Sequence, residues 1–251
     1  MPDNIVTVDL RRHLPLETGD LVLDVGCGPG RHTSEICLWD CRLLGIDVSR
    51  QDLKVARYLL AYKRWAHEAV GTGDFVQADA QRLPLKDALF DKIVCTEVLE
   101  HVPDDFAVVR ELVRVLKPGG LLAVSVPSYW PETVFSTLSP RYRPSVGHVR
   151  VYPRGTVEKM LREAGIEVYA HRLRHSVQAL YYFILCTFGV DNEGFPVTRL
   201  FQKLVDLHYG LRARPLEWLE AALNLVLGKE HVFYGRKPLA TPAVSIEGDA
   251  G

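Results

Sequence analysis

Three glycines stand close together in residues 21–30, LVLDVGCGPG, directly after an apolar run that predicts a buried strand. Gly26, Gly28 and Gly30 take side chains away from the turn, which leaves room for a ligand against the backbone. The spacing differs from the dinucleotide loop G-x-G-x-x-G, because Arg31 stands where that pattern has its third glycine. The lysine of a phosphate-binding loop is also absent. Taken alone, the glycines are equally typical of a tight strand-to-helix turn that binds nothing.

Three acidic residues accompany successive predicted strands. Asp24 lies in the strand before the glycines, Asp47 ends RLLGID, and Asp79 ends DFVQAD. The carboxyl ends of parallel strands meet at one edge of a sheet, where Asp47 could accept both hydroxyls of a ribose. Asp79 is placed to accept the exocyclic amine of an adenine. Because carboxylates repel a pyrophosphate, the pattern favours a neutral or cationic adenosine derivative.

A scaffold of alternating strands and helices must position these residues. Apolar runs predict strands over residues 21–25, 42–47, 74–79, 90–96 and 121–127. Residues at helical spacing predict helices over 31–39, 49–69 with Ser49 as cap, and 104–116, which ends at KPGG. This alternation predicts an α/β protein with a parallel, doubly wound sheet and helices on both faces.

Four segments resemble, in order, the motifs of the class I S-adenosylmethionine-dependent methyltransferases: VLDVGCGPGRHT, LLGIDVSRQDLKVAR, FVQADAQRLPLKDALFDKIVCTEVLEHV and LVRVLKPGGLLAVSVP. The resemblance covers residues 18–127 and is closest to the type 11-like small-molecule branch, which includes the quinone-pathway O-methyltransferases. It implies a Rossmann-like, doubly wound seven-stranded sheet whose last strand is antiparallel. It also implies S-adenosylmethionine as the cofactor and methyl transfer as the reaction.

The resemblance further implies cofactor-binding residues at the ends of the first four strands: Asp24, Gly26, Cys27, Gly28, Gly30, Asp47, Val48, Asp79, Ala80, Thr96 and Glu97. The glycine turn would surround the methionine end of the cofactor. Asp47 would hold the ribose, Val48 would pack on the adenine, and Asp79 with Ala80 would hold its polar edge. Thr96 and Glu97 would face the sulfonium. Cys27 is expected to be a small loop residue rather than a reactive thiol.

A second cluster, EVLEH at residues 97–101, follows the fourth strand. As a helical turn it would place Glu97, Glu100 and His101 on one face. His101 is then the candidate catalytic residue, as general base for a hydroxyl acceptor. The segment also resembles small-RNA 3′-end and metal-dependent quinone methyltransferases, which implies a divalent metal held by Glu97, Glu100, His101 and the later His148. The alternative is that Glu100 pairs locally and His101 is a polar wall residue.

The second half of the chain departs from the minimal pattern through an insertion. We expect a Rossmann-like core over residues 1–173, a helical insertion over 174–230, a last core strand over 231–238 and a disordered tail over 239–251. Three apolar segments at helical spacing fill the insertion. It could be a packed structural cap, a lid over the acceptor site, or a surface that contacts a membrane.

Composition narrows the function classes. The chain has 251 residues, a formal net charge of −1 and 47% hydrophobic residues, so no global field favours nucleic acid. Its five cysteines form no CxxC, which is typical of reduced thiols in a cytosolic protein. Residues 141–175 hold eight Lys and Arg against three acids, which suits a phosphate, anionic lipid or RNA, or a solvated basic face. No signal peptide is recognisable, and the uncharged run Ser176 to Val190 is too short to span a bilayer.

We therefore expect a cytoplasmic methyltransferase, with peripheral membrane contact as an alternative localisation. The expected acceptor is a hydroxyl on a small, partly apolar or lipid-linked metabolite, with Tyr129, Trp130 and His148 in the walls of its pocket. Nucleic acid is not the expected partner. The alternatives are an RNA or protein methyltransferase, or a non-catalytic regulator that binds the cofactor.

Overall fold

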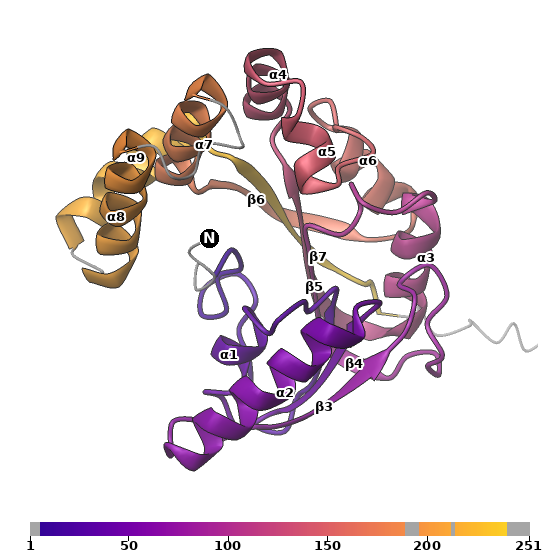
Figure 1. The fold of residues 1–251 in the computed structure, drawn as a ribbon. Coiled ribbons are helices and arrows are strands. Elements are labelled where there is room, and N and C mark those ends of the chain that lie inside the picture. Colours follow the sequence, from indigo (N-terminus) through magenta and orange to yellow (C-terminus); the bar gives the residue numbers. More distant parts are fainter. Residues whose placement is uncertain (1–5, 189–195, 212–213, 240–251) are drawn as a thin grey trace, which may run out of the picture.

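A seven-stranded sheet forms the centre of the computed structural model, which describes residues 6–188, 196–211 and 214–239 (Figure 1). Its strands are β1 (Leu21–Val25), β2 (Arg42–Asp47), β3 (Thr72–Gln77), β4 (Phe90–Thr96), β5 (Leu116–Pro127), β6 (Glu167–Arg174) and β7 (Glu230–Arg236). The order across the sheet is β3-β2-β1-β4-β5-β7-β6. Only β7 runs antiparallel to its neighbours β5 and β6. The predicted fold class is confirmed.

The helices within the described residues are α1 (Thr33–Ile36), α2 (Arg50–Trp65), α3 (Asp105–Val115), α4 (Tyr129–Leu138), α5 (Tyr142–Val146), α6 (Thr156–Glu163), α7 (Ser176–Phe188), α8 (Pro196–Leu211) and α9 (Arg214–Leu227). Successive strand residues point to opposite faces of the sheet. In β1, Leu23 and Val25 pack with α3 and α6, whereas Val22 packs with α1 and the N-terminal residues. Both faces are therefore covered, as a parallel sheet requires.

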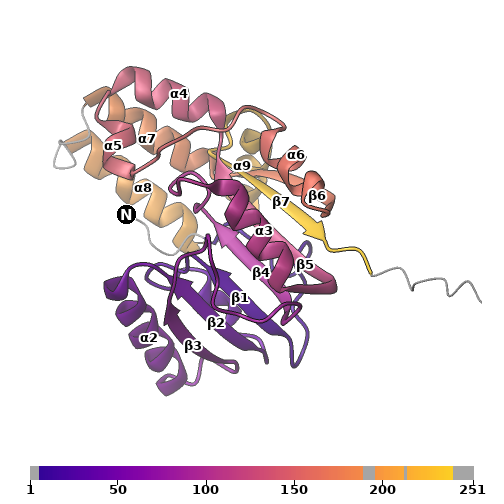
Figure 2. The ribbon, with the colours of Figure 1, turned by 90° about the vertical axis from the view of Figure 1, so that its right-hand side faces the viewer.

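Beside the sheet lie five helices that we call the cap: α4, α5, α7, α8 and α9. The first four share a second, smaller core, and α9 packs on α7. Phe135 of α4, Tyr142 of α5, Tyr182 of α7 and Val205 of α8 are buried in one cluster. Figure 2 shows α4, α5, α7 and α8 gathered at one end of the molecule. The cap thus joins two parts of the chain, the segment after β5 and the insertion between β6 and β7. The domain boundaries predicted above remain a prediction, and residues 240–251 of the expected tail lie outside the described residues.

Several predicted elements differ from the structure: β3 lies two residues earlier than expected, and α2 ends at Trp65 rather than at Ala69. The helix expected over 31–39 is only the four residues of α1, because the Cys37 carbonyl accepts the N–H groups of Val70 and Gly71 instead of continuing the helix. The strand expected from residue 121 begins at Leu116, which pairs with Phe90 before a shift in register. The KPGG segment therefore lies inside β5 rather than in a loop.

Candidate functional site

Glycine is required at two positions of the turn between β1 and α1. Gly26 has φ +68°, and a Cβ there would lie 2.3 Å from Cγ2 of Val98. A Cβ on Gly30, where φ is +100°, would lie 3.2 Å from Ala56 of α2. The turn thus passes close to two neighbouring elements and presents bare backbone on its other side. Cys27 beside it is buried, and burial raises the pKa of its thiol, so it is an inert loop residue.

Asp47 holds the glycine turn to the end of β2. Its Oδ2 accepts the N–H of Gly28 at 2.9 Å, and its Oδ1 accepts the N–H of Ser49 at 2.7 Å. Val48 beside it is 66% exposed, and Asp79, two residues after the end of β3, is exposed. These three residues lie along the open edge of the sheet, where the sequence predicted the adenosine end of the cofactor.

Asp24 lies behind the turn and is buried. Its Oδ2 accepts the Thr33 hydroxyl at 3.2 Å, and no described residue forms a hydrogen bond with its buried Oδ1. Burial raises the pKa of Asp24 to about 7. Asp24 is therefore buried beside Thr33 of α1 and does not line the cavity beside the glycine turn, and its role toward the cofactor remains a prediction.

A cavity of about 410 Å³ opens beside the glycine turn. Its core side is formed by predicted cofactor residues: Gly26, Cys27, Gly28, Thr96 and Glu97. Its far side comes mostly from the cap and the segment around it: Tyr142, His148, Gln178, Tyr182 and Lys229. His101 also lines it. The structure thus joins the glycine turn and the predicted catalytic histidine in one space, while the exposed Tyr129 and Trp130 do not line it.

The N-terminal segment closes one side of this site through a chain of hydrogen bonds. The Thr7 N–H donates to Nε2 of His32 at 3.2 Å, and Nδ1 of His32 lies 3.3 Å from Oγ1 of Thr96. Burial holds the pKa of His32 well below its usual value, so the ring is neutral. Because Nε2 accepts, Nδ1 carries the proton and donates to Thr96. The hydroxyl of Thr96 is therefore held at the end of β4.

Glu97 lies between two cations that the sequence reasoning missed. Its carboxylate is 3.2 Å from Arg31 and 3.2 Å from Lys229. Burial raises the pKa of Glu97, but Lys229 and Arg31 outweigh it and hold that pKa well below the usual value. Residues 97–101 form a turn rather than a helix, and Glu97 has φ +53°, so its side chain does not share a face with Glu100 and His101.

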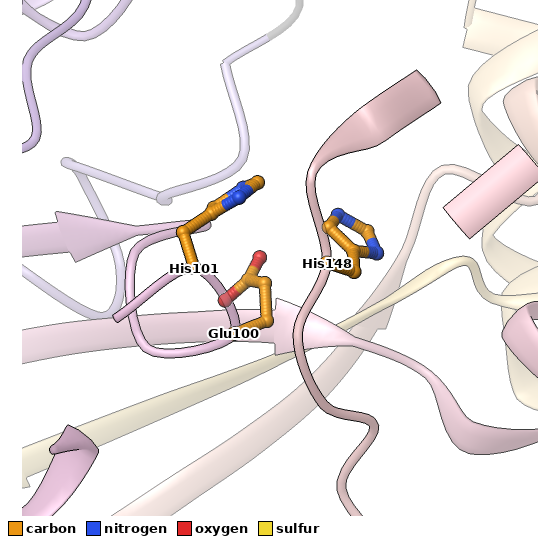
Figure 3. A group of neighbouring side chains, drawn as sticks. All are labelled: Glu100, His101 and His148. Carbon is orange, nitrogen blue, oxygen red and sulfur yellow. The ribbon is translucent and has the colours of Figure 1, made fainter. Parts of the chain in front are cut away.

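Glu100, His101 and His148 gather as the sequence suggested (Figure 3), and their ligand atoms lie within 4.8 Å of one another. Glu100 is fully buried, and neither of its oxygens has a hydrogen-bond partner among the described residues. Burial raises its pKa well above the usual value. Nδ1 of His101 is 3.0 Å from the Gly147 carbonyl, so the Gly147 bond uses Nδ1 and not Nε2. Of the four predicted metal ligands, three therefore meet, and Glu97 faces Arg31 and Lys229 instead.

Comparison with known proteins agrees with this geometry. The family described as "Methyltransferase domain" matches residues 23–124. A ubiquinone biosynthesis O-methyltransferase of Thiobacillus denitrificans is 34% identical over 180 residues, which cover 64% of this chain and 68% of that protein. The chain belongs to the S-adenosylmethionine-dependent methyltransferase family. The 27-O-demethylrifamycin SV methyltransferase of Amycolatopsis mediterranei is 36% identical over 159 residues, 61% of this chain and 56% of that protein. This methyltransferase-family chain spans 38 to 58% of the length of the first four relatives it matches.

Solved structures share the fold of this family member. A SAM-dependent methyltransferase from Methanosarcina mazei superimposes with a TM-score of 0.60 at 18% identity, over 94% of this chain and 100% of that one. The [4+2]-cyclase SpnF has a TM-score of 0.60 at 22% identity, over 92% and 78% of the two chains. A cyclase on the same fold illustrates that the site, not the fold, must carry the functional argument. Among the described residues, no helix is both long and apolar enough to cross a membrane.

Proposed function

We propose that this chain transfers the methyl group of S-adenosylmethionine to a hydroxyl of a small, partly apolar or lipid-linked molecule. The observation that carries the proposal is that Gly26 and Gly28 of the turn line the same cavity as His101 and His148. A methyl donor bound at the turn and an acceptor bound at the histidines would then lie in the same cavity. Alignment of acceptor, methyl and sulfur supplies most of the catalysis such a donor needs.

The cofactor residues predicted from the sequence fit this placement. Asp47 already accepts the N–H groups of Gly28 and Ser49, but each carboxylate oxygen can accept more than one hydrogen bond. Lone pairs therefore remain for the hydroxyls of a ribose. Val48 exposes its side chain for an adenine face. At the other end Arg31 and Lys229 offer positive charge and Glu97 negative charge. This arrangement complements the carboxylate and ammonium of the methionine end.

On the acceptor side we propose His101 as the residue that takes the hydroxyl proton. Burial lowers the pKa of His101, so the ring is neutral and can accept a proton at physiological pH. Tyr182 and Gln178 of α7 line the same cavity and would contact the body of the acceptor. The homologues named as O-methyltransferases support a hydroxyl acceptor over an amine.

Glu100, His101 and His148 also fit a divalent cation, which is the alternative role for this cluster: Nε2 of His101 would then bind the cation instead of taking the proton. Two imidazoles and one carboxylate form a ligand set that transition metals accept, and a buried carboxylate without partners is costly unless a cation or proton satisfies it. A bound cation would lower the pKa of a hydroxyl that it coordinates. The protein's own contribution is to hold the acceptor beside His101.

The exposed face of α8 supports a lipid-like acceptor or a lipid surface, and with it a peripheral membrane location for a cytoplasmic protein. Val197, Leu200, Leu204 and Leu207 follow one another at spacings of three and four residues, and each is 41 to 60% exposed. Two exposed basic residues of α8, Arg199 and Lys203, flank this row. Apolar and basic residues together are typical of helices that lie at a bilayer surface.

The test is a methyl-label experiment. Purified protein and methyl-labelled S-adenosylmethionine are incubated with an extract of the source cells, with and without chelator, and the products are partitioned between solvent and water. Label in the organic phase is expected, and Asp47→Ala is the matched control that should lose it. Label in RNA or protein would replace the proposed acceptor. Tight binding of S-adenosylhomocysteine without any labelled product would favour a non-catalytic regulator over an enzyme.

A further inference from the structure

The two halves of the histidine cluster come from different parts of the fold. Glu100 and His101 lie on the turn after β4, whereas His148 follows α5 in the cap-side segment. Two hydrogen bonds join these segments: the Val149 N–H donates to the Glu100 carbonyl at 2.9 Å, and the His101 side chain bonds the backbone of the other segment, with Nδ1 3.0 Å from the Gly147 carbonyl. The backbone around His148 is thus fixed from the core. Its ring still needs a separate constraint.

Glu132 of α4 supplies that constraint. It is fully buried, and its Oε2 lies 2.8 Å from Nδ1 of His148, whose side chain is only 6% exposed. Its Oε1 accepts the hydroxyl of Tyr142 at 2.7 Å. No Lys or Arg of the described residues forms an ion pair with it. A carboxylate this deeply buried is costly, so its two oxygens are committed to Tyr142 and His148.

We infer that Glu132 is a positioning residue for His148. It holds the ring proton on Nδ1, so the Nε2 lone pair stays free for a ligand bound beside Glu100 and His101. The inference rests on the proposed function, because His148 needs a free lone pair whether it binds a cation or accepts a proton at this site. A metal ligand must coordinate through an unprotonated nitrogen, and a proton acceptor must offer one. Carboxylates behind ligating histidines fix the tautomer and the ring orientation in this way.

Tyr142 makes the arrangement directional. Its hydroxyl is a donor to Oε1, so the carboxylate cannot turn away from His148 without losing that bond. The ring of Tyr142 also packs edge-on against His148, with centroids 6.4 Å apart. The His148 ring is therefore held by a hydrogen bond from one side and by an aromatic contact from another.

The experiment reads the tautomer directly. Protein labelled with ¹⁵N-histidine is examined by long-range ¹H–¹⁵N correlation, and the His148 signals are assigned with His148→Gln. In Glu132→Gln the amide N–H₂ can donate to Nδ1, which would move the ring proton to Nε2. Co²⁺ titration followed by visible absorbance gives a second readout without turnover. Glu158→Gln, at a half-buried glutamate of α6 that pairs with Arg162, is the matched control.

We expect the wild type to show the Nδ1–H form of His148 and Glu132→Gln to lose it, with Co²⁺ affinity falling 10–100-fold where Co²⁺ binds. Tyr142→Phe, which keeps the carboxylate, should retain the Nδ1–H form and guards against a folding artefact. A wild type without Co²⁺ binding but with the expected tautomer change would support Glu132 and count against the cation of the proposed function. An Nε2–H form in the wild type, or an unchanged tautomer in Glu132→Gln, would overturn the inference.

Discussion

The carboxylate of Asp47 accepts the backbone N–H of Gly28 at 2.9 Å, which ties the end of β2 to the glycine turn after β1. The two strands are also paired in register up to Val25 and Ile46. One side chain therefore stands both behind the turn and at the edge where a ribose would bind. Binding at that edge and the shape of the turn depend on the same carboxylate.

Replacing Asp47 should weaken cofactor binding strongly. Asp47→Ala removes charge-assisted hydrogen bonds worth about 1.5–3 kcal/mol, so affinity for S-adenosylhomocysteine should fall about 10–100-fold in isothermal titration calorimetry. Asp74→Ala, at an exposed carboxylate of β3, is the control and should bind as the wild type does. Affinity of Asp47→Ala within twofold of the wild type would show that the ribose lies elsewhere.

The local elements could be predicted from the sequence because their causes are local. Apolar runs bounded by turns placed β1, β2 and β4 at their observed residues, and Ser49 caps α2 by accepting the Asp52 N–H at 3.2 Å. Gly26 could be recognised because its positive φ excludes other side chains. Each of these features depends on residues only a few positions apart.

The partners inside the site could not be predicted, because they are distant in sequence and lie outside the motifs. Lys229 meets Glu97 across 132 positions of the chain, from the junction of α9 and β7. Glu132 is a buried acid in an ordinary helical segment, and only the fold brings it to His148. The helical turn expected over EVLEH was wrong because Glu97 takes a left-handed backbone conformation at the end of β4.

The raised pKa of Asp24 should make stability depend on pH. Its pKa of about 7 in the folded protein exceeds the ordinary 3.8, so the folded state holds the proton more tightly than the unfolded state. Stability is therefore lost as pH rises from about 4 to about 7. Asp24→Asn removes this dependence, and its stability relative to the wild type should rise by up to about 1.4 kcal/mol per pH unit in that window. Urea unfolding of the cofactor-free proteins at several pH values measures it, and parallel pH curves would contradict it.

Removing Lys229 should destabilise the fold, since it takes one of two cations from Glu97 and the cation that pairs with the buried Glu230. Lys229 is only 6% exposed and lies 3.2 Å from Glu97 and 3.7 Å from Glu230. Lys229→Met should lower the free energy of unfolding by about 3–5 kcal/mol, and adding Glu97→Gln should restore part of it. Lys159→Met, at an exposed surface pair, should cost no more than about 1 kcal/mol. Equal losses in the two lysine variants would show that Lys229 is not held by its charge.

The exposed row on α8 should govern binding to lipid. In low salt, vesicles containing phosphatidylglycerol should sediment with the wild-type protein, and Leu200→Ser with Leu204→Ser should weaken this partitioning at least about tenfold, because two apolar side chains lose their burial in the bilayer. Leu38→Ser, at an exposed leucine after α1, should have no effect. High salt should weaken the binding only in part, since screening acts on the basic residues and not on the leucines. Equal sedimentation of the double variant and the wild type would assign this face of α8 to another role.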